Sequence, residues 1–322
     1  MLTEKILVIG ACGQLGTELT EALYPIFGDE NVIASDISSK SKSDVINIFE
    51  TLDVLDINNL SAIVDKYKIT QIYHLAALLS ASGEKNPKFA WKLNVDGLIN
   101  VLDVSVEKKI KKVYFPSSIA VFGSNTPSDN TPQFTTMDPI TVYGISKQAG
   151  ERWCEYYFNK YGLDVRSLRY PGIISYKTMP GGGTTDYAVE IFYKALQQGF
   201  YECYLAENTY LPMMYMADAI RATLELMEAE CEKIKIRSSY NLSSLSFSPK
   251  EIASSIQKII RDFSITYNPD FRQQIADSWP NSIDDSFARK DWGWKPEFAL
   301  DKMTEDMLFH LKNKIPFLLF IK

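Results

Sequence analysis

The sequence has little of what a metal site or a disulfide scaffold requires. Only two histidines, His74 and His310, occur among 322 residues, and the four cysteines show no C-x-x-C spacing. Zinc sites are built from clusters of cysteine and histidine, so we expect no metal. Reduced thiols in a cytosolic protein are the simplest interpretation of the scattered cysteines, which are Cys12, Cys154, Cys203 and Cys231.

Basic charge and long hydrophobic runs are also scarce. The formal net charge is -6, whereas a nucleic-acid partner requires a basic face, so we expect no such partner. No run approaches the ~20 apolar residues that span a bilayer. The first strand begins within a few residues of Met1, which leaves no room for a leader peptide. We therefore expect a cytoplasmic protein that does not bind membranes.

Three glycines follow the first predicted strand. Residues 6–9 form an apolar, β-branched run typical of a buried parallel strand, and residues 14–23 predict the helix after it. Gly10, Gly13 and Gly16 between them allow a sharp turn, a close approach to a pyrophosphate and tight helix packing. The positive end of the helix then faces the phosphates. The alternative is a glycine-rich turn that binds nothing.

An acidic residue ends the second predicted strand. Asp36 follows the strand 32–35, about twenty residues after Gly16, where a carboxylate accepts hydrogen bonds from an adenosine ribose. Because a 2′-phosphate would be repelled there, the sequence favours NAD over NADP, although Lys40 and Lys42 weaken this preference. The alternative is a turn residue at the end of a strand.

A tyrosine and a lysine are spaced for alcohol oxidation. Tyr143 and Lys147 share one face of a helix predicted over residues 143–161. A tyrosine with a pKa of about 10 is a poor base near neutrality, so an ammonium and an oxidised nicotinamide would have to stabilise its phenolate. Ser118, at the end of another strand, is the expected donor to the substrate oxygen, with Ser117 as its alternative. The expected absence of zinc excludes the zinc-dependent design for this chemistry.

Further cofactor contacts are expected at the ends of two more strands and in one helix. Asp53 is placed to accept from the adenine amino group, and Val54 to pack on the ring. Ala76 would let the backbone approach the cofactor, while His74 before it is either a general base or, more simply, a structural group. Asn94, in a helix predicted over residues 89–107, is a candidate for a water or backbone contact that orders the lysine; otherwise it is satisfied locally.

Six features together resemble a known family, the extended short-chain dehydrogenases/reductases, over almost the whole chain. They are the three glycines, Asp36, H-L-A-A at 74–77, N-V-D-G at 94–97, Ser118 and Y-x-x-x-K at 143–147. Within that family, four segments resemble the L-threonine 3-dehydrogenases: 78–84, 169–175, 181–187 and 211–218. The resemblance implies NAD-dependent oxidation of the L-threonine 3-hydroxyl to 2-amino-3-oxobutanoate, which goes to glycine or aminoacetone. The expected cofactor contacts also include Cys12, Gln14, Leu15, Ile37, Ser38, Leu75, Tyr170 and Ile173.

A zwitterionic substrate needs donors for its carboxylate and an acceptor for its ammonium. Beside Ser118 and Tyr143, the expected substrate contacts are Ser80, Gly182, Thr184, Thr185 and Asp186, with Asp186 as the counter-charge. The same residues are equally an N-terminal cap for the helix predicted over 186–198, with Thr185 or Asp186 at the capping position.

Two other functions compete with this interpretation. A sugar-nucleotide epimerase or dehydratase shares the scaffold and the Y-x-x-x-K pair. Many of those enzymes resemble one another at R-Y-F-N, where the asparagine contacts the nucleotide sugar, but this chain has R-Y-P-G at 169–172. A redox-sensing protein that binds the cofactor without turnover is the second competitor. The complete set of Ser118, Tyr143 and Lys147 argues against it.

Short strands alternate with helices up to about residue 168, which predicts an α/β fold, a Rossmann doubly wound parallel sheet. We expect an NAD-binding domain over 1–169, with a return strand near 239–242, and a smaller substrate lobe formed mostly by 170–322. The outer faces of helices 89–107 and 143–161 predict a homodimer. Alternatively, the aromatic residues there, such as Trp153, Tyr156 and Tyr157, simply cover the sheet.

Overall fold

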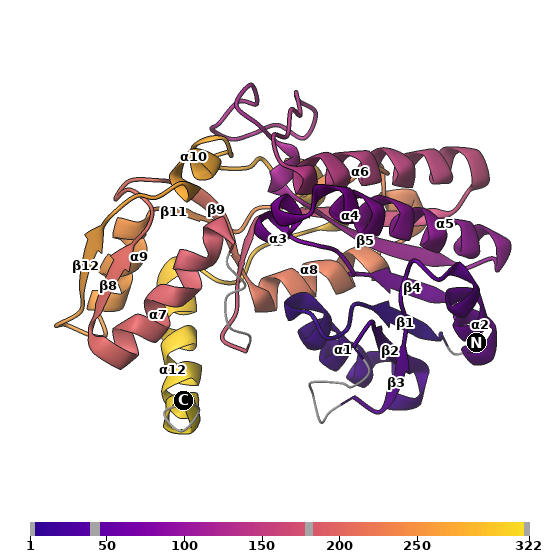
Figure 1. Ribbon diagram of the computed structural model, residues 1–322, viewed down its shortest axis with the longest axis horizontal. Helices are drawn as coiled ribbons and strands as arrows, with labels where there is room; N and C mark the ends of the chain where they lie inside the picture. Colours follow the sequence, from indigo (N-terminus) through magenta and orange to yellow (C-terminus); the bar gives the residue numbers. More distant parts are fainter. Residues whose placement is uncertain (1–3, 39–45, 178–182, 319–322) are drawn as a thin grey trace.

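The computed structural model describes residues 4–38, 46–177 and 183–318 and has two lobes (Figure 1). The larger lobe contains a seven-stranded parallel sheet in the order β10-β6-β5-β4-β1-β2-β3. This confirms the predicted α/β Rossmann fold. The strands are β1 (Ile6–Ile9), β2 (Val32–Asp36), β3 (Ile48–Thr51), β4 (Gln71–His74), β5 (Lys112–Ser118), β6 (Asp164–Tyr170) and β10 (Tyr240–Asn241).

Helices cover both faces of this sheet because successive side chains of a strand point to opposite faces. Leu7, for example, packs with α2, α5 and α6, and its neighbour Val8 packs with α1, α8 and α11. The helices are α1 (Gln14–Phe27), α2 (Ile57–Tyr67), α5 (Gly97–Glu107), α6 (Val142–Tyr161), α8 (Met216–Glu228) and α11 (Ser286–Trp292). The second half of the chain therefore contributes to both lobes.

One predicted helix is interrupted. Instead of a regular α-helix over 89–107, the chain forms α4 (Pro87–Trp91), a π-helical turn (Lys92–Asp96) and α5. A π turn inserts one extra residue per turn, so it rotates the side chains on either side relative to each other. Asn94 lies within this turn.

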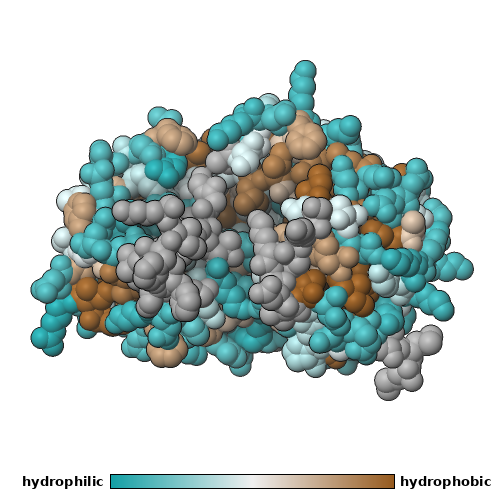
Figure 2. Space-filling model, turned by 60° about the horizontal axis from the view of Figure 1, so that its bottom comes forward, coloured by the Kyte–Doolittle hydropathy of each residue, from teal (hydrophilic) through white to brown (hydrophobic). Residues whose placement is uncertain are grey.

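The smaller lobe has its own core, built on two short sheets. Strands β11 (Leu245–Phe247), β9 (Leu211–Tyr215) and β7 (Gly172–Ile174) form one sheet, and β12 (Ser264–Tyr267) and β8 (Phe200–Cys203) form the other. Four helices complete the lobe: α7 (Tyr187–Gln198), α9 (Pro249–Gln257), α10 (Arg272–Asp277) and α12 (Leu300–Leu318). Figure 2 shows hydrophobic side chains between the lobes and hydrophilic side chains over much of the periphery.

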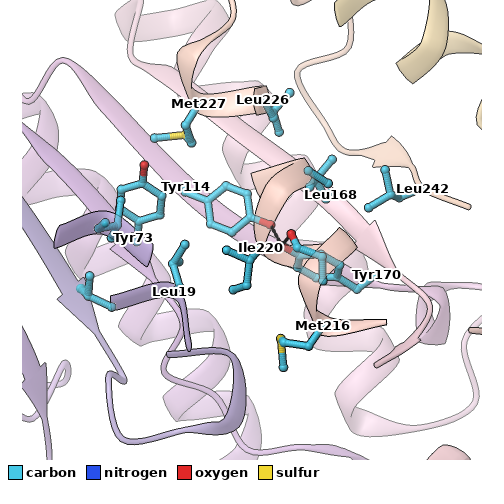
Figure 3. Close-up of a cluster of buried hydrophobic side chains, with 14 of the residues drawn as sticks. Leu19, Tyr73, Tyr114, Leu168, Tyr170, Met216, Ile220, Leu226, Met227 and Leu242 are labelled. Atoms are coloured by element: carbon cyan, nitrogen blue, oxygen red, sulfur yellow. Dashed lines mark hydrogen bonds between the residues drawn. The ribbon is translucent and has the colours of Figure 1, made fainter. Parts of the chain in front are cut away.

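Three tyrosines lie in the core beneath the large sheet (Figure 3). The hydroxyl of Tyr114 donates to that of Tyr170 at 2.6 Å, and Tyr170 is also hydrogen-bonded to Thr223 of α8. Tyr73 lies beside Tyr114, with ring centroids 5.8 Å apart. The Tyr170 side chain is thus part of the core, and the predicted contact of this residue with the cofactor stays a prediction.

No helix in the described part of the chain is long and apolar enough to cross a membrane.

The close approach of α6 to β5 depends on Gly150. A Cβ at this position would lie 2.6 Å from Cζ of Phe115 and 3.1 Å from Cδ2 of Leu98. Replacing glycine by alanine in a helix normally stabilises by about 1 kcal/mol, but overpacking a dense core costs about 1–3 kcal/mol. We expect Gly150→Ala to lower the free energy of unfolding by about 1 kcal/mol in urea titrations.

A Phe115→Leu background provides the control for this prediction because leucine lacks the Cζ atom. The same Gly150→Ala change should cost less there. A Gly150→Ala protein at least as stable as the parent would contradict the packing argument.

Candidate active site

The carboxyl ends of the parallel strands share one edge of the large sheet, and the glycine turn lies there after β1. Gly10 has a φ of +87°, and a Cβ on it would lie 2.7 Å from the main-chain nitrogen of Ala76. A Cβ on Gly16 would overlap the carbonyl oxygen of Gly10. Gly13 begins α1 without a side-chain cap. The turn therefore leaves helix-end N–H groups available to a phosphate, as the glycine spacing predicts.

Asp36 joins the turn to the end of β2. Its carboxylate accepts from the main-chain N–H of Cys12 at 3.0 Å and from that of Ser38 at 3.1 Å. Ile37 beside it is 67% exposed. A carboxylate beside an uncovered apolar side chain fits the ribose and adenine of a dinucleotide, so the residues present fit NAD.

The helix that carries the tyrosine and the lysine begins in a fixed position. The side chain of Thr141 accepts from Gly144 N–H at 3.1 Å and caps α6. Glu84, from α3 (Ser80–Lys85), accepts from Val142 N–H at 2.8 Å. A Cβ on Gly144 would clash with the carbonyl oxygen of Ala120, so this glycine lets α6 start directly beside the end of β5.

Tyr143, Ser118 and Lys147 are brought together there. The Ser118 side chain interacts with the Tyr143 hydroxyl and lowers its pKa, and Lys147 Nζ lies 5.6 Å from the centroid of the tyrosine ring. The ammonium donates to the carbonyl oxygen of Pro116 at 2.6 Å and lies 4.6 Å from the Phe115 ring centroid. Ser117, the alternative to Ser118, instead donates to Glu151 at 2.6 Å.

Burial disfavours the charged form of both catalytic candidates. It raises the pKa of Tyr143 to about 12, against the opposing effect of the Ser118 hydrogen bond. It lowers the pKa of Lys147 to about 8, an effect that the carboxylate of Glu151 partly offsets. The protein alone therefore does not make this tyrosine a strong base. The predicted stabilisation of phenolate requires a further positive charge in the pocket.

Asn94 connects three elements of the site. Its amide oxygen accepts from Leu78 N–H at 2.8 Å, and its amide nitrogen donates to Leu78 O and to Ser146 Oγ, both at 3.0 Å. Ser146 in turn donates to the carbonyl oxygen of Tyr143 at 2.7 Å. The π turn thus orients Asn94 toward the loop after β4 and toward α6. Asn94 acts on the catalytic helix through Ser146, and the hydrogen bond of Lys147 is made to Pro116.

An ion pair that the sequence analysis missed lies behind these groups. Glu151 is fully buried one helical turn after Lys147, and Arg169 at the end of β6 donates to both of its oxygens, at 2.8 and 2.7 Å. Arg169 also donates to Asn241 Oδ1 at 3.0 Å. An acidic residue four positions after Lys147, on the same helix face, was the available signal.

The two residues expected to contact the adenine, Val54 and Asp53, differ in exposure. Val54 is 2% exposed, and a Cβ on Gly97 of α5 would lie 2.8 Å from its Cγ1 atom. Its side chain therefore packs against α5, and the expected contact of Val54 with the adenine ring stays a prediction. Asp53 is exposed and accepts from Leu55 N–H at 2.9 Å. Ile173 lies on β7, partly buried against the core beneath the sheet.

The predicted substrate residues lie on two segments. Ser80 begins α3, which packs on α6. Thr184, Thr185 and Asp186 form a 3-10 turn before α7, in which Asp186 Oδ2 accepts from Gly183 N–H at 2.6 Å. This bond closes the 3-10 turn that precedes α7; the predicted side-chain cap of α7 by Asp186 is not formed. Gly182, also predicted as a substrate contact, lies outside the described residues.

Among the described residues, no group of three or more histidine, cysteine, aspartate or glutamate side chains is placed to hold a metal ion. All four cysteines are free thiols.

The model of the NAD dependent epimerase/dehydratase family matches residues 6–243. An uncharacterized epimerase/dehydratase of Staphylococcus haemolyticus is 48% identical over 314 residues, which cover 97% of this chain and 98% of that protein. The holo form of an L-threonine dehydrogenase from Cupriavidus necator is 53% identical with a TM-score of 0.94, covering 95% of this chain and 99% of that one. A monomeric L-threonine 3-dehydrogenase from a metagenome, in apo form, is 50% identical with a TM-score of 0.92, covering 96% and 99%.

His74 should make the protein sensitive to acid. It is 2% exposed, its Nδ1 atom is buried without a hydrogen-bond partner, and burial lowers its pKa to about 3, aided by the charge of Lys147. Below pH ~6.5 the unfolded chain protonates this histidine while the folded protein does not. The free energy of unfolding should therefore fall as pH decreases from about 6.5 toward 4, and less steeply in His74→Asn.

Urea titrations at pH 7, 6, 5 and 4 measure this difference, with His310→Asn as the control because His310 is partly exposed on α12. Equal pH slopes for His74→Asn and the parent would contradict the prediction. Retained turnover in His74→Asn would also exclude this histidine as the general base.

Proposed function

Because the chain belongs to the NAD dependent epimerase/dehydratase family, we propose that it is an L-threonine 3-dehydrogenase. It oxidises the 3-hydroxyl of L-threonine to 2-amino-3-oxobutanoate with NAD as its cofactor. The observation that carries the proposal is the group formed by Ser118, Tyr143 and Lys147 at the end of β5. Two solved L-threonine dehydrogenases at 50% identity or more, aligned over nearly the whole chain, support the choice of substrate.

In this proposal Ser118 donates to the substrate oxygen and holds it against Tyr143, and the phenolic oxygen removes the hydroxyl proton. Lys147 keeps a positive charge beside the phenol. Bound NAD would supply the acceptor for the hydride and a positively charged nicotinamide in the pocket. Burial excludes water, so each charge acts more strongly on the pKa of Tyr143 than it would in solvent.

The cofactor-binding residues follow from the sheet edge. Helix-end N–H groups of the turn at Gly10 to Gly16 hold the pyrophosphate, and Asp36 accepts from the adenosine ribose. Asp36 also disfavours the phosphate of NADP. Ala76 and its neighbours offer main-chain contacts. The remaining contacts in the proposed site are Cys12, Gln14, Leu15, Ile37, Ser38, Asp53, Leu75, Asn94 and Ile173.

L-threonine is small and zwitterionic, so its pocket must supply charge complements at short range. Ser80, Thr184 and Thr185 carry hydroxyl donors for the carboxylate. Asp186 is the proposed counter-charge for the ammonium, and its carboxylate also accepts from Gly183 N–H.

A sugar-nucleotide epimerase is the alternative on the same scaffold. In this chain R-Y-P-G ends β6 and begins β7, so proline and glycine occupy the positions where an amide would contact a nucleotide sugar. Gly172 is packed against Thr185 of the proposed substrate segment, where a side chain would have no room. This favours the smaller substrate.

The proposed enzyme works as a cytosolic homodimer. Large apolar side chains are exposed on α4 and α6, which lie along the upper side of the larger lobe in Figure 1. They are Phe89, Trp91, Ile145, Trp153, Tyr156 and Tyr161, each 36–47% exposed. Tyr157, by contrast, is 5% exposed and covers the core. A two-fold axis would bury the exposed group against its own copy.

The purified protein incubated with NAD and L-threonine should form NADH, measured by absorbance. Tyr143→Phe removes the proposed base while keeping the ring, so we expect kcat to fall by at least ~10²-fold. NADH binding, measured by fluorescence, should change little.

Ser117→Ala is the matched control for Ser118→Ala in the same assay, because Ser117 bonds to Glu151. Only Ser118→Ala should lower kcat strongly. Turnover of a UDP-sugar with NAD tightly retained, and no reaction with threonine, would favour the epimerase. A Tyr143→Phe enzyme at parental speed would refute the proposed base.

Light scattering tests the dimer. The parent should have the mass of two chains, and Trp153→Glu, which places a charge in the proposed contact, should have the mass of one. Phe271→Glu is the control, since Phe271 is 70% exposed on the smaller lobe. A parent with the mass of one chain would show that these aromatic side chains only cover the helix surface.

A further inference from the structure

A short segment after β7 contacts helix α1 of the larger lobe. The Ser175 side chain is buried and donates to Glu18 Oε1 at 2.5 Å. Lys177 Nζ lies 2.5 Å from Glu21 Oε2 and 4.0 Å from Glu18 Oε2. Two residues of the segment Ser175–Lys177 are therefore bound to two carboxylates one turn apart on the same helix.

The residue between them contacts the smaller lobe instead. The ring of Tyr176 stacks on His310 of α12, with centroids 4.0 Å apart and planes 5° from parallel. The main-chain oxygen of Tyr176 accepts from the Tyr193 hydroxyl of α7 at 3.4 Å. Three consecutive residues thus hold the two lobes together, with Ser175 and Lys177 on one side and Tyr176 on the other.

Both elements joined by this segment, α1 and β7, also contact the proposed active site. α1 begins at the glycine turn, and Glu18 and Glu21 follow Gly13 by five and eight residues, roughly 8 and 12 Å along the helix axis. In the opposite direction the segment continues from β7, where a Cβ on Gly172 would lie 2.8 Å from Cβ of Thr185. The cofactor turn and the proposed substrate segment are therefore linked through one helix and one strand.

We propose that Glu18, Glu21 and Lys177 are positioning residues, which set the substrate segment of the smaller lobe at the distance from the cofactor turn that hydride transfer requires. This inference rests on the proposed function. None of the three contacts the reacting atoms; they act through β7 and α1.

The partial exposure of these side chains determines whether a substitution affects stability or catalysis more strongly. The side chains of Lys177 and Glu21 are 33% and 26% exposed, and ion pairs at this exposure contribute little to stability. Hydride transfer, by contrast, depends steeply on the placement of the reacting groups. Charge reversal should therefore act on catalysis with threonine much more than on folding.

The experiment reverses the charges singly and together. In Lys177→Glu the new carboxylate faces both Glu18 and Glu21, so we expect kcat/KM for L-threonine to fall about fivefold or more. The effect should lie mainly in kcat, because the reacting groups are misplaced. The Kd for NADH should stay within about twofold, because the glycine turn is unchanged. Adding Glu21→Lys restores an opposite charge and should recover most of the loss.

Lys258→Glu is the matched control. Lys258 pairs with Asp301 at 2.7 Å, but both residues belong to the smaller lobe, so its reversal should leave the kinetic constants and NADH binding unchanged. Thermal unfolding of every variant reports whether the fold is kept.

Four outcomes are distinguishable. Loss in Lys177→Glu with recovery in the double variant supports the proposal. Kinetic constants unchanged in Lys177→Glu overturn it while the proposed function stands. Loss without recovery also overturns it, because the pairing of Lys177 with Glu21 is then not the cause. A parent protein that reduces no NAD with threonine refutes the proposed function, and this inference with it.

Discussion

The buried ion pair between Glu151 and Arg169 fixes the catalytic helix on the sheet. Arg169 and Ser117 are neighbours across β6 and β5, and both donate to the same carboxylate of α6. Removing one partner of such a pair leaves a buried charge uncompensated, at a cost of about 3–5 kcal/mol. The rotation of α6 is therefore tightly set, and with it the position of Lys147, one turn before Glu151.

That constraint explains how a buried tyrosine and a buried lysine coexist. With all effects included, the pKa of Tyr143 rises to about 12 and that of Lys147 falls to about 8, mainly because burial disfavours the charged form of each group. Glu151 and the carbonyl oxygen of Pro116 oppose the effect on the lysine. The Glu151 side chain one turn away thus helps Lys147 remain cationic near neutral pH. Its cation is then available beside the phenol.

The sequence predicted the larger lobe well because its signals are local. Apolar β-branched runs, glycine spacing and Y-x-x-x-K each depend on a few adjacent residues, and the sheet places them together at one edge. The features that the sequence does not reveal depend on tertiary packing. The side chains of Tyr170 and Val54, for example, pack into the core. The π turn at Asn94 and the pairing of Glu151 with a strand eighteen residues away depend on packing that no local pattern specifies.

The division of the chain between the two lobes also depends on tertiary packing. The chain crosses to it at Pro171 after β6, but α8, β10 and α11 return to the larger lobe, so no single boundary in the sequence separates the two. In the proposed enzyme, a substrate bound between the lobes would depend on how they are held together as much as on its own contacts. Helix α1 begins at the glycine turn and carries Glu18 and Glu21, which contact Ser175 and Lys177, so it links the proposed cofactor site to the smaller lobe.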